Sequence, residues 1–342
     1  MLPPEVTAHL TRHHAVITHA ALLQLGVDRA EVKRWAAQGS LVRLRRGAYT
    51  DAATWGEADE YHGRPRLLAL AASATMQHRH VLSHDSAAHV LGLDFLQPAR
   101  PLLHVTRDRV VGSRTCSGVK HHGAPYRAEQ VVEVDGVRVL DPVRTALDLG
   151  REHGLHAGTS ACDQALRRGA TREDLVRAAA DMWSWPQVTT VRRCIELADG
   201  GAENPGETLA RIVVAGLGFG RPRTQFPVRT RWGLRWCDLV VGAHVIEFDG
   251  RLKYRESAAG ERAGDVVWRE RSRERALLDA GLGVSRVTWT ELRADSVPAT
   301  SARLIREINE TVRRVGPVMP VHLERAATDL ESQRTARLRH AA

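Results

Sequence analysis

The residues of this sequence best suited to chemistry are three carboxylates within the stretch LRWCDLVVGAHVIEFDGRLKY, residues 234–254. Two β-rich runs flank Gly242-Ala243, a pair typical of a type II′ hairpin turn. Pairing outward from this turn sets Asp238 opposite Glu247, with their Cβ atoms roughly 5 Å apart, and Asp249 shares that face of its strand. Like charges that face each other among apolar residues are costly unless a cation compensates them. Carboxylate oxygens are the ligands that Mg²⁺ prefers, so the spacing predicts a divalent-metal site.

The order of these residues resembles the PD-(D/E)xK nuclease superfamily. Asp238 is followed by Glu247-Phe248-Asp249-Gly250, then by a predicted helix and an apolar strand at 284–289. Over about residues 204–292 the chain is similar to domains related to very-short-patch-repair (Vsr) endonucleases, in which aspartate also occurs at the lysine position of the motif, here Asp249. The resemblance implies a restriction-endonuclease-like α/β core that holds Mg²⁺ or Mn²⁺ on Asp238, Glu247 and Asp249 and cleaves DNA.

Residues around this motif have roles that the resemblance implies. Lys253 could supply a displaced cationic group for catalysis, and Tyr254 stands where the Vsr-related branch often carries histidine. Glu207 lies where superfamily members often bring another glutamate to the metal. The sequence Asn204-Pro205-Gly206-Glu207 also predicts a helical capping box, so Glu207 has two interpretations that can coexist.

A basic, aromatic stretch precedes the acidic hairpin. From 221 to 235 there are five arginines and no acidic residue, and Trp232 and Trp236 interleave with them. Arginine beside tryptophan suits a nucleic-acid surface, whereas the alternative is tryptophans in the core with solvated arginines. Arg235 or Arg251 could equally neutralise an ordinary acidic patch. The predicted DNA-contacting residues of this stretch are Arg229, Arg231 and Arg235.

The composition indicates a soluble protein with a polyanionic partner. The chain has 342 residues, a net charge of +9 and 43% hydrophobic residues, and its isoelectric point is about 10.1. Its four cysteines form no C-x-x-C pair, which disfavours a zinc site or a disulfide framework and predicts a reducing, cytoplasmic environment. No signal-peptide core or membrane-length apolar run is present, so we expect no membrane association.

The first 55 residues have the pattern of a winged helix-turn-helix. We expect helices at 4–13, 20–25 and 29–38, with Thr18 and Asp28 as N-caps and Gly39 after the third helix. Two short strands around Arg45-Arg46-Gly47 would form the wing. A basic helix of this kind enters the major groove of DNA while wing residues reach phosphates; the alternative is a solvated helical hairpin. The predicted DNA contacts here are Arg29, Lys33, Arg34, Arg43, Arg45 and Arg46.

This segment also resembles the DNA-binding domain of the AbiEi antitoxins of type IV toxin–antitoxin systems, through VITHAALLQLGVDRAEVKRWAAQGSLVRLRRGAYT, residues 16–50. The string LDPVRTA, residues 140–146, recurs in the region that follows the winged helix in such proteins. The resemblance implies binding to the promoter of the protein's own operon and a cognate toxin as a partner.

The middle region, residues 64–200, is predicted to be α/β with a helical connector at 155–200. We expect a buried helix at 67–76, strands at 102–106 and 118–122, a hairpin at 131–140, and a helix that begins at Pro142. Ser83-His84-Asp85 has the wrong spacing for a catalytic triad, and we interpret Ser83 and His84 as a helix cap and a packing residue. His121-His122 could be a metal pair, but neighbouring strand residues point to opposite faces, so one of the two is expected to be exposed.

The sequence thus predicts an α+β multidomain protein. Its parts are a winged helix (1–55), the middle region (64–200), a nuclease-like domain (201–316) and a polar tail (317–342). The first functional hypothesis is a metal-dependent endonuclease that its winged helix directs to double-stranded DNA. The alternative is a non-catalytic, antitoxin-like transcriptional regulator with a degenerate nuclease core.

Overall fold

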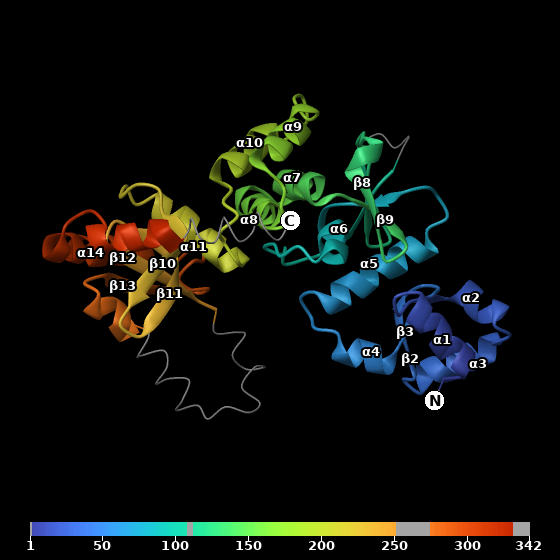
Figure 1. Ribbon diagram of the computed structural model, residues 1–342. Helices are drawn as coiled ribbons and strands as arrows, with labels where there is room; N and C mark the ends of the chain where they lie inside the picture. The colour runs from blue at the N-terminus through green and yellow to red at the C-terminus, as the bar shows by residue number, and fades with distance from the viewer. Residues whose placement is uncertain (1, 108–111, 251–273, 331–342) are drawn as a thin grey trace. The chain divides into compact units, whose positions relative to one another are not determined.

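The computed structural model describes residues 2–107, 112–250 and 274–330 (Figure 1). The chain divides into two compact units, Met1–Ala198 and Asp199–Ala342. Both combine helices with sheets, which confirms the predicted α+β class. Lys253, Tyr254 and Arg251 lie outside the described residues, as do part of the helix predicted before the strand at 284–289 and the last residues of the predicted tail.

The first unit begins with three short helices and a small sheet. The helices are α1 (Pro4–Arg12), α2 (His19–Gln24) and α3 (Arg29–Ala37), and the strands β1 (Ile17–Thr18), β2 (Leu41–Arg45) and β3 (Ala48–Asp51) have the order β1-β3-β2. Both predicted caps are confirmed, because Thr18 Oγ1 accepts a hydrogen bond from Ala21 N at 3.1 Å and Asp28 Oδ1 accepts one from Glu31 N at 2.8 Å. Val32 and Trp35 turn the apolar face of α3 into the core.

A six-stranded sheet with the order β6-β7-β5-β4-β9-β8 forms the centre of the middle region. The predicted strands are confirmed within a residue at their ends. Helices α5 and α6 pack on this sheet through leucine, alanine and valine side chains. The bounds are α4 (Ala52–Glu57), α5 (Gly63–Thr75), β4 (Val81–Leu82), α6 (His84–Leu91), β5 (Leu103–Thr106), β6 (Ser113–Cys116), β7 (Val119–His122), the 3₁₀ turn η1 (Ala128–Gln130), β8 (Val131–Val134) and β9 (Val137–Leu140).

Four helices complete the first unit: α7 (Pro142–His153), α8 (Leu155–Arg167), α9 (Arg172–Ala180) and α10 (Val188–Leu197). Helices α7 and α8 approach closely, since a Cβ added to Gly158 would lie 2.4 Å from the Gly150 Cα atom. Gly169 ends α8 with a positive φ of 100°, and Thr171 caps α9. Arg144 of α7 is buried and bonds through Nε to Asp148 Oδ2 at 2.9 Å.

The second unit is a four-stranded sheet with helices. The strand order is β10-β11-β12-β13, and β12 and β13 run parallel. Pairing of Leu239 with Ile246, Val240 with Val245 and Val241 with His244 confirms the predicted hairpin register. The bounds are α11 (Pro205–Ala215), β10 (Arg223–Thr230), β11 (Gly233–Val241), β12 (His244–Asp249), β13 (Gly283–Thr288) and α14 (Val297–Val315).

The region predicted to be a polar tail from 317 onward differs from that expectation. Residues 321–330 are helical. Met319, Leu323 and Ala327 are buried against the sheet core of the second unit, because their apolar side chains recur at helical spacing within the charged sequence. Within the part of the chain that the structure describes, no helix is long and apolar enough to cross a bilayer.

Candidate functional site

The predicted DNA-contacting cations of the N-terminal segment lie on α3 and on and beside the β2–β3 turn. Arg29, Lys33 and Arg34 project from α3, and Arg43 and Arg46 lie on and after β2; all five side chains are exposed. Only Arg34 has an ion pair among the described residues, with Glu31 at 3.1 Å. The predicted DNA-contacting residues therefore lie where a polyanion can reach them, except for Arg45.

Arg45 is held differently from its neighbours. The β2–β3 ladder is irregular between Arg43 and Arg45, and Arg45 is only half-exposed. Its Nε and Nη1 atoms are buried and have no hydrogen-bond partner among the described residues. Burial lowers the pKa of Arg45. The pKa of His121 on β7 is also lowered, first by burial and then by neighbouring cations that include Arg45. Arg45 thus faces the middle sheet, which makes it a poor phosphate ligand in this arrangement.

The predicted hairpin register holds, but Asp238 and Glu247 are not themselves a pair of the β11–β12 ladder. The β11–β12 ladder ends at Leu239 and Ile246, one pair short of Asp238 and Glu247. Asp238 Oδ2 instead accepts a hydrogen bond of 2.8 Å from the backbone N–H of Phe248. The Phe248 ring packs against Gly206 and stands edge-on to Trp289, with ring centroids 5.1 Å apart. Asp238, Glu247 and Asp249 are all half-buried.

Glu207 is buried at the start of α11, and only half of the predicted capping box forms: Asn204 Oδ1 accepts from Glu207 N, but the Glu207 carboxylate does not accept from the backbone N–H of Asn204. That carboxylate accepts hydrogen bonds from the backbone N–H of Glu203 at 2.7 Å and from Asn204 Nδ2 at 2.6 Å, and Asn204 Oδ1 caps the helix. Burial first, and then the charge of Asp238, raise the pKa of Glu207 to about 7. The charge of Asp238 on β11 thus acts on Glu207 of α11, after the larger effect of burial.

The predicted metal ligands fit one ion only in part. Their oxygen donors suit Mg²⁺ or Mn²⁺, but the groups of potential ligands with donor atoms within 4.8 Å of one another in the described residues do not include Glu207, Asp238, Glu247 or Asp249. Protein donors already engage Glu207 and Asp238. We therefore derive no metal-dependent step from this arrangement.

The arginine–tryptophan stretch lies on the β10–β11 hairpin. Trp232 is 61% exposed and Trp236 is 38% exposed, so the alternative that both tryptophans pack in the core is wrong. Arg231 stacks over Trp232 at 5.1 Å and pairs with Asp279 at 2.6 Å. Arg229 is exposed, while Arg235 is half-buried. The exposed end of this hairpin is a second surface that could contact an anion.

Two expectations about histidines and serine need correction. Ser83 precedes α6 but its side chain does not cap the helix; instead Ser83 Oγ lies 3.1 Å from His84 Nδ1. His84 is buried as the expected packing residue, and it packs against two other buried histidines, His104 and His122. His121 and His122 alternate along β7, but His122 is buried and His121 is half-buried rather than exposed as expected. Sequence reasoning missed His104, whose position alternates with apolar residues in a short strand.

Two comparisons with known proteins give matches, one to a family model at the N-terminus and one to curated proteins over 104 residues. Residues 5–50 match the family model described as "Transcriptional regulator, AbiEi antitoxin". Two uncharacterised proteins of Mycobacterium tuberculosis, from strains CDC 1551 / Oshkosh and ATCC 25618 / H37Rv, are each 28% identical to the chain over 104 residues. These matches span 30% of this chain and 38% of each relative.

Proposed function

We propose that this protein is a transcriptional regulator that binds double-stranded DNA through a winged helix-turn-helix at residues 4–51. The observation that carries the proposal is a coincidence of two findings: the AbiEi antitoxin match covers residues 5–50, and the exposed cations of α3 and the β2–β3 turn lie within that range. In this interpretation α3 is the recognition helix and the β2–β3 turn is the wing.

The dimensions and charge of α3 suit the major groove. Its 9 residues correspond to about 13 Å of helix, which the groove accommodates. Asp28 caps its first turn, and the first residues of a recognition helix are those that contact base edges. Arg29 and Lys33 lie one turn apart on its exposed side. Arg43 and Arg46 would neutralise phosphates beside the groove, which sets register and affinity rather than sequence preference.

The DNA target and the protein partner follow from the kind of regulator that the match describes. We infer that the target is the promoter of the protein's own operon and that a cognate toxin is encoded beside it. A basic chain with a net charge of +9 binds any duplex weakly, so the relevant property is the ratio of specific to non-specific affinity.

The test is a fluorescence-anisotropy titration of the full chain. One duplex carries the sequence upstream of the protein's own reading frame, and the other is a shuffled duplex of equal length and composition, at the same salt concentration. The proposal predicts at least about 10³-fold tighter binding to the upstream duplex. Equal affinity for the two duplexes would contradict an autoregulatory role.

The interaction between Glu207 and Asp238 favours a second candidate function, DNA cleavage by the C-terminal unit with Mg²⁺ or Mn²⁺ as the cofactor. The charge of Asp238 opposes ionisation of Glu207, and a divalent cation bound near the two carboxylates would compensate their charges. Purified protein would be incubated with supercoiled plasmid and Mg²⁺, Mn²⁺ or EDTA. Cleavage would be supported by nicking that needs the metal and is lost in Asp238→Asn, while anisotropy still reports duplex binding. An intact plasmid under all conditions would reject the cleavage function and leave only the regulatory one.

A further inference from the structure

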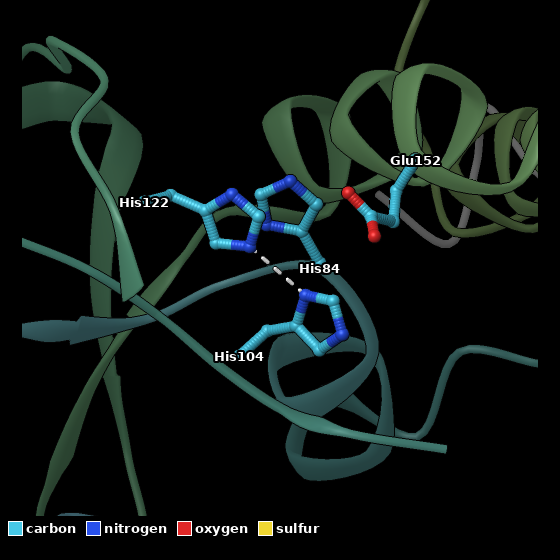
Figure 2. Close-up of side chains that lie close together, drawn as sticks. All are labelled: His84, His104, His122 and Glu152. Carbon is cyan, nitrogen blue, oxygen red and sulfur yellow. Dashed lines mark hydrogen bonds between the residues drawn. The ribbon is translucent and has the colours of Figure 1, made fainter. Parts of the chain in front are cut away.

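Three buried histidines meet in the middle region of the first unit (Figure 2). His84 begins α6, His104 lies on β5 and His122 ends β7. His104 pairs with Lys120 and Thr106 pairs with His122 in the parallel β5–β7 ladder, so His104 and His122 share one face of the sheet. We call these three residues, together with Glu152 of α7, the histidine cluster.

The donor atoms of the histidine cluster are close enough to surround one ion. One potential ligand atom from each of the four residues lies within 4.8 Å of the others. His104 Nδ1 and His122 Nε2 are 3.0 Å apart, and the rings of His84 and His122 are stacked with centroids 3.9 Å apart. Nitrogen ligands at about 2.05 Å from a tetrahedral Zn²⁺ are themselves about 3.3 Å apart, which is near the observed separation.

The outward nitrogens of the three imidazoles meet oxygen atoms. His84 Nδ1 lies 3.1 Å from Ser83 Oγ, and His122 Nδ1 lies 3.3 Å from Ser113 Oγ. His104 Nε2 faces Asp85 Oδ1 at 3.9 Å. When each outward nitrogen carries the proton, the inward nitrogen presents its lone pair, as in metal sites whose histidines are oriented by an outer oxygen.

Asp85 is itself fixed in place. It is 1% exposed, and its Oδ1 atom lies 2.6 Å from His153 Nε2. Glu152 forms an ion pair with Lys120. Figure 2 shows its carboxylate directed toward the histidine rings. The cluster therefore has three nitrogen donors, one carboxylate and an outer layer of partners.

All three imidazoles are buried, where the charged form is disfavoured. Burial first, and then neighbouring histidines, lower the pKa of His84, and the same causes lower that of His122 to about 3. Burial also lowers the pKa of His104. His84 further adopts a positive φ of 49°, an uncommon conformation for this residue type that is often found at functional sites.

We propose that His84, His104 and His122 bind a divalent transition-metal ion, with Zn²⁺ as the best-suited ion and the Glu152 carboxylate as the fourth ligand. Imidazole nitrogen suits Zn²⁺, Co²⁺, Ni²⁺ or Cu²⁺, whereas Mg²⁺ and Ca²⁺ prefer all-oxygen sites. The site is separate from the acidic hairpin and lies in the other compact unit. Because its ligands come from α6, β5, β7 and α7, the ion would join the sheet to two helices.

The competing explanation is a hydrogen-bonded histidine network with no ion. In that case a hydrogen bond joins His104 Nδ1 and His122 Nε2, which are 3.0 Å apart, and either nitrogen can be the donor. The two explanations differ in what they predict for metal binding by the purified chain.

The test uses the full chain without a polyhistidine tag, treated with EDTA and dialysed. Zn²⁺ affinity is measured by competition with a chromophoric chelator, and Co²⁺ is added separately to record its visible absorption. The proposal predicts about one equivalent of Zn²⁺ per chain, a tetrahedral Co²⁺ spectrum and a higher melting temperature with Zn²⁺. No Zn²⁺ binding by the folded wild-type chain would overturn it.

Variants locate the ion. His104→Ala should abolish this binding, and His121→Ala is the matched control, because His121 is in the same region but faces away from His122. Cys116→Ser removes the exposed thiol as a competing site and should leave the stoichiometry unchanged. Since His104→Ala risks unfolding, Asp85→Asn serves as a second variant and should weaken Zn²⁺ affinity by about 10- to 100-fold while circular dichroism stays native. Wild-type affinity in folded His104→Ala or Asp85→Asn would contradict the assignment.

Discussion

Removing Arg43 and Arg46 should weaken DNA binding in a way that can be calculated. Both side chains are exposed, and neither has an ion pair among the described residues, so each is available to one phosphate. Each lost phosphate contact lowers the slope of log affinity against log salt by about 0.9, so Arg43→Ala with Arg46→Ala should lower it by about 1.8. Between 50 and 200 mM salt, that slope difference corresponds to roughly a 12-fold smaller loss of affinity in the double variant.

The assay is fluorescence anisotropy of the full chain on one labelled duplex at several salt concentrations. Arg79→Ala with Arg100→Ala is the matched control, because these two arginines are also exposed in the first unit and their loss changes the net charge equally. Arg45→Ala forms a third arm and should change the slope little, because Arg45 faces the middle sheet. The reasoning is refuted if the double variant keeps the wild-type slope or if the control pair lowers it as much.

Three further predictions concern stability. Arg144→Met leaves the fully buried Asp148 without its partner at 2.9 Å, so urea unfolding should show that the free energy of unfolding falls by roughly 3 kcal/mol. This is the lower end for a broken buried pair, because Arg151 also reaches the Asp148 carboxylate. An unchanged free energy of unfolding would show that the pair is dispensable. Glu207 has an ordinary pKa of 4.5 and a pKa of about 7 in the fold, so the folded state retains a proton that the unfolded chain releases, and stability should fall as pH rises from about 4.5 to 7. Glu207→Gln should flatten that part of the melting-temperature profile, and an unchanged profile would assign it to other groups. Gly158→Ala would place a Cβ 2.4 Å from Gly150 Cα, so calorimetry should show a lower melting temperature, with a cost of about 1–3 kcal/mol; wild-type melting would mean that α7 and α8 separate easily.

Local features of the fold were predictable from the sequence because their determinants lie close together in the chain. The hairpin register around Gly242 follows from alternation and a turn residue with a positive φ of 55°. The caps at Thr18, Asp28 and Asn204 follow from side chains that bond within three residues.

Features that depend on distant contacts were not predictable in the same way. The Asp238 carboxylate bonds to the Phe248 backbone, and a pairing rule for side chains cannot anticipate that choice. The orientation of Arg45 depends on the middle sheet, which packs on β2 and β3 through Leu44 and Ala48. The burial of Met319 and Leu323 depends on a sheet more than thirty residues earlier.

The histidine cluster is the clearest example of this limit. His84, His104 and His122 lie on three elements separated by stretches of other residues, so no motif of fixed spacing links them. The lack of cysteine pairs also argued against a zinc site, yet imidazoles and a carboxylate can supply every ligand that such a site needs. Only the β5–β7 register and the start of α6 bring these side chains together.

The proposed DNA contact lies in the N-terminal segment, residues 4–51, rather than in the arginine–tryptophan hairpin of the second unit. Hydrogen–deuterium exchange of the full chain, with and without the upstream duplex, measures this directly for backbone amides. DNA binding by the N-terminal segment should slow exchange in α3 and the β2–β3 turn, residues 29–48, and leave exchange at residues 229–236 unchanged. Protection confined to residues 229–236, with none in α3 or the turn, would contradict it.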